Sequence, residues 1–170
     1  MADGVPCWAD LTIGDGPDVV AYYAAVLGWS FTAGGAAGHH EAVALADGRR
    51  VGLWESDDVG PGPEWVEAAS AEPGQTKTFY GAVLGHTHAP TDEPGTTTLH
   101  RDGPALGAVV FAGDALPHWL VHFAVADADA AARAAQAAGG LVVGAPAPHR
   151  AGRRAVLADP SGARFAVLSR

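Results

Sequence analysis

The segment that decides the fold is Tyr-Tyr-Ala-Ala-Val-Leu-Gly-Trp at residues 22–29, because it recurs as Phe-Tyr-Gly-Ala-Val-Leu-Gly-His at residues 79–86. The surrounding sequence repeats as well, since Pro6-Cys7-Trp8 and Pro63-Glu64-Trp65 precede the two copies at the same spacing. A more diverged third copy starts at residue 117 with Pro-His-Trp. Internal repeats of this length predict structurally equivalent units that stack or pair.

Each of the three repeats has the same internal pattern. The alternating stretch at residues 8–13 predicts a half-buried strand, and Asp15-Gly16-Pro17 predicts the start of a helix. The helix has apolar residues at a helical period and is expected to end at Gly28, followed by strands around 29–34, 39–46 and 50–55. In the third repeat, a helix from Asp127 to Ala138 and strands at 141–144, 154–158 and 163–168 are expected.

The order strand, helix and three strands predicts an α+β protein made of three βαβββ modules. The modules are expected at 1–58, 64–116 and 117–170, with a Gly-Pro linker at 59–63. One such module leaves a sheet face bare, and a pair of modules covers this face and encloses an open, barrel-like cleft. Because three is an odd number, the remaining module is expected to pair across a homodimer. Alternatively, the first and third modules close the barrel and the second pairs elsewhere.

Composition excludes several classes of partner. The 170 residues include 19 acidic and 10 basic side chains, a formal net charge of −9, and a single lysine, Lys77. Nucleic acid and anionic membranes require clustered basic residues and are therefore not expected as partners. No long apolar run or recognisable signal peptide is present, and the lone Cys7 forms no internal disulfide. These features predict a soluble cytoplasmic protein.

The repeated aromatic helix, the Asp-Gly hairpin before the last strand and the terminal Asp159-Pro160-Ser161-Gly162 resemble the vicinal oxygen chelate superfamily. This superfamily includes glyoxalases, bleomycin-resistance proteins and extradiol dioxygenases. The starts of the first and third modules are similar to an actinobacterial branch that usually has four modules in tandem. The resemblance implies the fold, but the superfamily contains lyases, isomerases, dioxygenases, transferases and drug-binding proteins.

Metal-dependent members of this superfamily place ligands on the first and last strands of a module. By the resemblance, the first-strand positions fall on Trp8, Trp65 and Leu120, and the last-strand positions on Gly52, Gly107 and Ala166. None of these side chains coordinates a divalent cation. The sequence therefore predicts no metal and no other cofactor.

Side chains two residues beyond the first-strand positions face the same way. These are Asp10, Glu67 and His122, of which His122 is unusual because it interrupts an apolar strand. We expect His122, with Glu67 or Asp10, to be the acid–base residues if the protein is an enzyme. The expected ligand contacts come from aromatic, apolar and polar residues of the cleft: Trp8, Trp54, Trp65, His100 and Leu120.

Four functions remain open at this point. The favoured hypothesis is a metal-independent protein that binds a small organic ligand, an aromatic or antibiotic-like metabolite. The main alternative is a metal-free isomerase, cyclase or lyase of secondary metabolism. A metalloenzyme whose displaced ligands come from His100, His122, Glu67 and Asp10 is a third possibility. A purely structural or dimerising module is the fourth.

Overall fold

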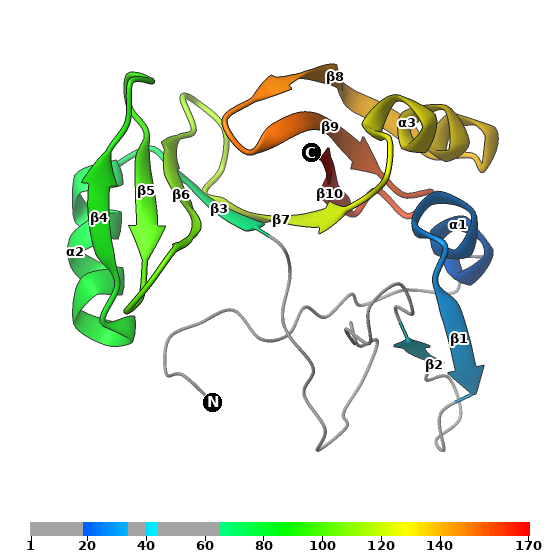
Figure 1. Cartoon of the computed structure of the whole chain (residues 1–170), viewed down its shortest axis with the longest axis horizontal. Coiled ribbons are helices and arrows are strands. Elements are labelled where there is room, and N and C mark those ends of the chain that lie inside the picture. Colours follow the sequence, from blue (N-terminus) through cyan, green and yellow to red (C-terminus); the bar gives the residue numbers. More distant parts are fainter. Residues whose placement is uncertain (1–18, 34–39, 44–64) are drawn as a thin grey trace. The chain divides into compact units, whose positions relative to one another are not determined.

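The computed structural model describes residues 19–33, 40–43 and 65–170 (Figure 1). These residues belong to two compact units. The first unit contains residues 65–121, and the second contains the described residues before 65 together with 122–170. Helices and strands occur in both, which confirms the predicted α+β class. No helix among the described residues has the length and apolar character that crossing a bilayer requires.

The first unit has the predicted order strand, helix and three strands. Its elements are β3 (Trp65–Ser70), α2 (Pro73–Leu84), β4 (Thr87–Pro90), β5 (Thr97–His100) and β6 (Ala105–Phe111). The strands follow the order β4-β5-β6-β3, in which β3 and β6 run parallel and the other neighbours antiparallel. Ala68, Leu99 and Val109 form the core between this sheet and α2, with Tyr80 of α2 packed against them.

The second unit repeats this order. Its elements are α3 (Ala128–Ala137), β8 (Leu141–His149), β9 (Gly152–Ala158) and β10 (Arg164–Ser169), preceded by β7 (His118–Ala124), which begins in the first unit. The strand order is β7-β10-β9-β8, with β7 parallel to β10. Helix α1 (Val19–Leu27) and the antiparallel pair β1 (Ser30–Ala33) and β2 (His40–Val43) also belong to this unit.

Local sequence signals explain where the helices begin and end. Asp127 is the N-cap of α3, because its carboxylate accepts hydrogen bonds from the backbone N–H groups of Asp129 (2.8 Å) and Ala130 (3.0 Å). Helix α2 ends at Gly85, which has a φ of 66°. This left-handed conformation favours glycine, and the side chain of Arg101 occupies the space that a Cβ would need.

The core of the second unit forms between large residues on α1 and small residues on α3. Tyr22, Tyr23 and Val26 are buried against the alanines of α3 and against Phe165 and Val167 of β10. Gly140, which follows α3, is required here because its Cβ would lie 2.5 Å from a ring carbon of Tyr22. Helix α1, which belongs to the first predicted module, therefore packs against residues of the third predicted module.

One strand is longer than the sequence predicted. Strand β8 continues to His149, whereas the sequence predicted that it ends at residue 144. It tolerates two prolines because it is an edge strand whose pairing with β9 is interrupted by register shifts.

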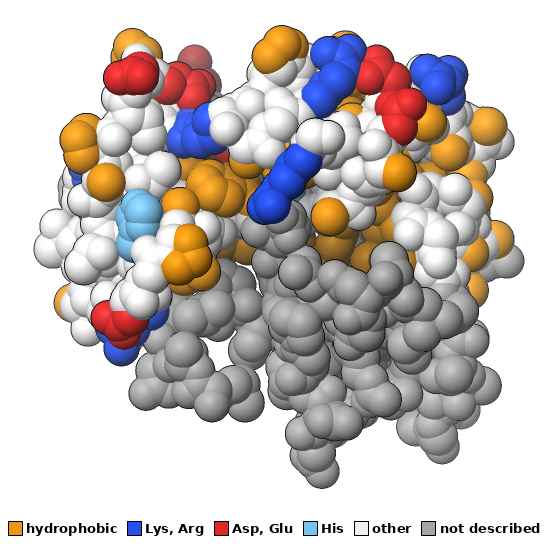
Figure 2. Space-filling view, viewed as in Figure 1, with side chains coloured by type: hydrophobic (Ala, Val, Ile, Leu, Met, Phe, Trp, Pro, Cys, Tyr) orange, Lys and Arg blue, Asp and Glu red, His pale blue; other side chains and the backbone are white. Residues whose placement is uncertain are grey.

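On the face in Figure 2, acidic and basic side chains are interspersed, and the described residues there form no continuous basic patch.

Candidate functional site

The inward face of the second unit is the sheet face that points away from α1 and α3. Phe123 and Val167 pack towards the helices, so His122 and Ala166, which pair across β7 and β10, face the opposite side. His122 is fully buried, with 0% exposure. The structure therefore places His122 on the inward face of the second unit.

A second histidine lies next to His122. The rings of His122 and His149 stack with their centroids 5.9 Å apart and their planes 25° apart. His149 is the last residue of β8 and is half-buried, and its Nδ1 accepts a hydrogen bond from the backbone N–H of Ala151 at 3.3 Å. Sequence reasoning missed His149, because it lies beyond the predicted end of its strand.

The inward face of the first unit carries a separate set of polar residues. Glu67, which is buried, pairs with Ala108 on β6, and Ala108 pairs with Thr98 on β5. Oγ1 of Thr98 lies 2.8 Å from Nε2 of His100, whose Nδ1–H donates to the carbonyl of Gly103 at 3.2 Å. His100 therefore lies on the same side as Glu67. The predicted pairing of Glu67 with His122 joins two units and stays a prediction.

The positions that hold a metal in the superfamily can be checked in the described residues. Trp65 and Leu120 are buried on the first strands, and Ala166 is buried on β10. Gly107 pairs with Val66 and therefore lies on the helix side, so the inward position of β6 beside Glu67 is Ala108. The sequence-based alignment was displaced by one residue at this strand, where a register shift lies between Leu99 and His100.

None of these side chains supplies a metal ligand, so they do not fit the superfamily's usual ion. Three further predicted site residues, Asp10, Trp8 and Trp54, lie outside the described residues, as does Gly52. The ligand contacts predicted for Trp65, Leu120 and His100 stay predictions.

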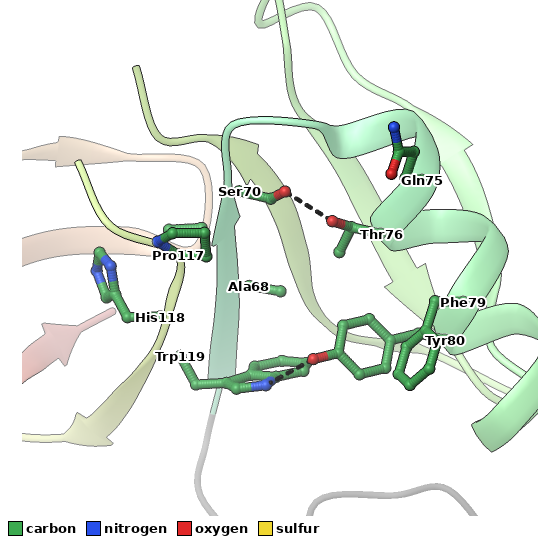
Figure 3. A pocket seen from close by; sticks show the side chains of 10 residues that line it. Ala68, Ser70, Gln75, Thr76, Phe79, Tyr80, Pro117, His118 and Trp119 are labelled. Carbon is green, nitrogen blue, oxygen red and sulfur yellow. Dashed lines mark hydrogen bonds between the residues drawn. The ribbon is translucent and has the colours of Figure 1, made fainter. Parts of the chain in front are cut away.

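A groove with a volume of about 340 Å³ lies on the helix side of the first unit (Figure 3). Its lining comes from β3, the first two turns of α2 and the residues around the start of β7: Ala68, Ala69, Ser70, Gln75, Thr76, Phe79, Tyr80, Pro117, His118 and Trp119. Three of these residues are aromatic. A concave surface of this size with a few polar groups suits a small organic ligand.

The aromatic rings of the groove are held in place by each other. Nε1–H of Trp119 donates to the hydroxyl of Tyr80 at 3.0 Å, and the two rings meet edge to face with centroids 5.0 Å apart. Phe79 contacts Tyr80 in the same manner. Trp119 is 41% exposed and Phe79 is 59% exposed, so both present ring surface to a ligand.

Polar atoms fix the other end of the groove. Oγ of Ser70 accepts hydrogen bonds from the hydroxyl of Thr76 at 2.7 Å and from the backbone N–H of Glu72 at 3.0 Å. These bonds join the end of β3 to the first turn of α2, and the bond between Ser70 and Thr76 is drawn in Figure 3. Nδ1–H of His118 donates to the carbonyl of Leu116 at 2.8 Å. The groove therefore combines a fixed aromatic wall with hydroxyl groups.

Comparisons with known proteins identify the family. A model of the glyoxalase-like domain matches residues 65–168, more than half of the chain. The anthracycline biosynthesis protein DnrV of Streptomyces peucetius is 40% identical over 127 residues, which are 70% of this chain and 46% of that protein. The anthracycline biosynthesis protein DauV of Streptomyces sp. strain C5 is 38% identical over 128 residues, again 70% and 46%. The chain thus spans about half the length of these relatives.

Among solved structures, a variant of the methylmalonyl-CoA epimerase of Streptomyces coelicolor aligns with 63% of this chain and 92% of its own. The identity is 19% and the TM-score is 0.45, too low for an argument about function. The family match covers the two βαβββ modules that the structure describes in full. The chain therefore belongs to the glyoxalase-like domain family, within the vicinal oxygen chelate superfamily that its repeated segments resemble.

Proposed function

We propose that this protein binds a small planar aromatic compound of secondary metabolism in the groove of the first unit. The observation that carries the proposal is the pair of hydrogen-bonded aromatic rings, Trp119 and Tyr80, beside the exposed ring of Phe79. Rings that are already fixed lose little conformational entropy when a ligand stacks on them. A flat ligand buries the exposed ring surface, and the hydroxyl groups orient it.

The relatives support the same class of ligand. Two proteins that share 38% and 40% identity with this chain are named for anthracycline biosynthesis, and anthracyclines contain fused aromatic rings. The groove lining contains one histidine, His118, and no carboxylate or thiol. Binding in the groove is therefore independent of a metal ion, because a single imidazole is a weak site for any cation.

A titration with an anthraquinone, a planar compound with three fused rings, tests the proposal. Binding is followed by calorimetry on the full chain and on the variant Trp119→Ala, with the non-aromatic analogue perhydroanthracene as the ligand control. The Trp119 ring is expected to contribute about 1–2 kcal/mol of stacking to the binding free energy. Its loss should therefore weaken binding roughly 5- to 30-fold. Trp119 is partly exposed, so the variant should fold.

Trp29→Phe is the matched protein control for this titration. Trp29 is a half-buried tryptophan of the second unit, where it stacks on Tyr23 at a centroid distance of 5.4 Å. Its replacement should leave anthraquinone binding unchanged. Equal binding to Trp119→Ala and to the parent protein would remove the groove from the proposal.

A second candidate is an enzyme that alters the bound compound. The complete burial of His122 on an inward sheet face, with the ring of His149 stacked on it, favours this alternative, because buried imidazoles often transfer protons in catalysis. Liquid chromatography with mass spectrometry of the compound after incubation distinguishes the two candidates. A product with a changed mass or a changed retention time that disappears with His122→Gln supports an enzyme, whereas an unchanged compound supports a binding protein.

A further inference from the structure

We infer that the second unit contains a binding site for a divalent transition-metal ion, held by the imidazoles of His122 and His149. The ring nitrogens that they offer lie within 4.8 Å of each other. His122 comes from the middle of β7 and His149 from the end of β8, so two elements distant in sequence bring the pair together. This inference does not rest on the ligand proposed for the groove.

The type of donor selects the type of ion. Imidazole nitrogen binds Zn²⁺, Co²⁺, Ni²⁺ and Cu²⁺, whereas Mg²⁺ and Ca²⁺ require oxygen ligands. The four strands β7 to β10 contain no aspartate or glutamate, so these strands add no carboxylate to the two imidazoles. A site of two neutral nitrogens leaves coordination positions for water and is expected to bind a transition metal with modest affinity.

The distances are compatible with one shared ion after a small movement. Two nitrogens that bind the same Zn²⁺ at about 2.0–2.1 Å lie roughly 3–3.5 Å apart in a tetrahedral arrangement. His122 is fixed by complete burial, while His149 is half-buried at the end of its strand. The inferred site therefore requires a rotation of the His149 ring that brings the nitrogens to this spacing.

One hydrogen bond must break when the ion binds. The N–H of Ala151 donates to Nδ1 of His149, and a neutral imidazole has a single lone pair available for either a hydrogen bond or a metal. If Nδ1 binds the ion, this lone pair is used. If Nε2 binds it, Nδ1 carries the ring proton. In both cases Ala151 loses its acceptor, which provides a local signal of binding.

This pair differs from the usual metal positions of the superfamily. Those positions fall on Leu120 and Ala166 in this module, and neither side chain is a ligand. His122 lies two residues after the first-strand position, and His149 lies on the module's second strand rather than on its last. The inferred site is therefore particular to this chain's own residues.

The test uses the full chain without an affinity tag, treated with a chelator and then titrated with Zn²⁺ alone by calorimetry and with Co²⁺ alone by visible absorption. We expect one equivalent of each ion and a change in the amide resonance of Ala151. His149→Gln and His122→Gln should each weaken binding at least 10-fold. His118→Gln, which removes an exposed histidine from the first unit, is the matched control and should bind as the parent does.

Three outcomes would overturn the inference. The first is the absence of stoichiometric binding to the parent protein, and the second is undiminished binding to His149→Gln. If His122→Gln fails to fold because its site is completely buried, His149→Gln alone decides, since its half-buried side chain tolerates replacement. A loss of binding in His118→Gln equal to that in His149→Gln would also contradict the site.

Discussion

Asp159 organises the turn between β9 and β10 and attaches α1 to it. Its buried carboxylate accepts hydrogen bonds from the N–H groups of Ser161 (2.9 Å) and Ala163 (3.0 Å) and from the hydroxyl groups of Ser161 (2.6 Å) and Tyr23 (3.2 Å). Replacement by alanine leaves these donors without their acceptor. We expect Asp159→Ala to lower the free energy of unfolding by about 2–3 kcal/mol, measured by urea denaturation.

Tyr23→Phe separates the contribution of one bond from the rest. It removes one donor, while the carboxylate keeps the others, so the expected loss is about 1 kcal/mol. The exposed Asp92→Ala is the control and should leave the unfolding midpoint unchanged. A loss for Tyr23→Phe as large as that for Asp159→Ala would show that the turn itself contributes little.

The two buried tyrosines predict a loss of stability at high pH. Burial, followed by the negative charge of Asp159, raises the pKa of Tyr22 to about 12 and also raises the pKa of Tyr23. Because the folded pKa exceeds that of the unfolded chain, near 10, this stabilisation is complete below pH 10 and decreases as the pH rises towards 12. Urea denaturation across this range should show the decline, with a smaller slope for Tyr23→Phe. Equal slopes would contradict the assignment to these tyrosines.

The residues of the candidate sites were only partly predictable. The inward direction of His122 followed from strand alternation, because β7 is regular. His149 could not be found this way, since Pro146 and Pro148 obscured the strand and register shifts change its alternation. The prediction that the chain holds no metal rests on the superfamily's ligand positions alone. The metal titration of the parent protein and of its His122→Gln and His149→Gln variants tests this prediction.

The repeated helices α1 and α2 have equivalent sequences but different surroundings. Val26 of α1 is 7% exposed, because α1 packs on α3, whereas the equivalent Val83 of α2 is 61% exposed. Val26→Ala should therefore cost about 1.5–3 kcal/mol and Val83→Ala less than about 0.5 kcal/mol in urea denaturation. Similar losses for both substitutions would contradict the different packing of the two helices.

The order of elements in the modules was predictable, but the groove was not. The helix periods, the Asp127 cap and Gly85 follow from local rules that a sequence displays directly. The groove depends on Trp119 meeting Tyr80, two residues separated by 39 positions and lying on the helix side of the sheet. The ligand contacts predicted from the sequence are expected on the inward side of the sheet instead. The sequence did contain one signal for the groove. Tyr80 lies in the repeated helix segment, and Trp119 lies in the Pro-His-Trp sequence that starts the third repeat.

The odd number of modules predicts a homodimer. Sedimentation equilibrium should then give twice the mass of the chain at micromolar concentration. A monomer across the accessible concentrations would contradict this prediction. The packing of α1 among third-module residues is the local contact that the alternative, in which the first and third modules close the barrel and the second pairs elsewhere, requires.

The proposed function requires that an aromatic compound binds in the groove of the first unit. A crystal structure of the protein with the anthraquinone probe shows where the compound lies. We predict that the ring system lies against Trp119 and Phe79, above Ser70 and Thr76, with the hydrogen bond between Trp119 and Tyr80 intact. A compound bound elsewhere, with the groove filled by solvent, would contradict the claim.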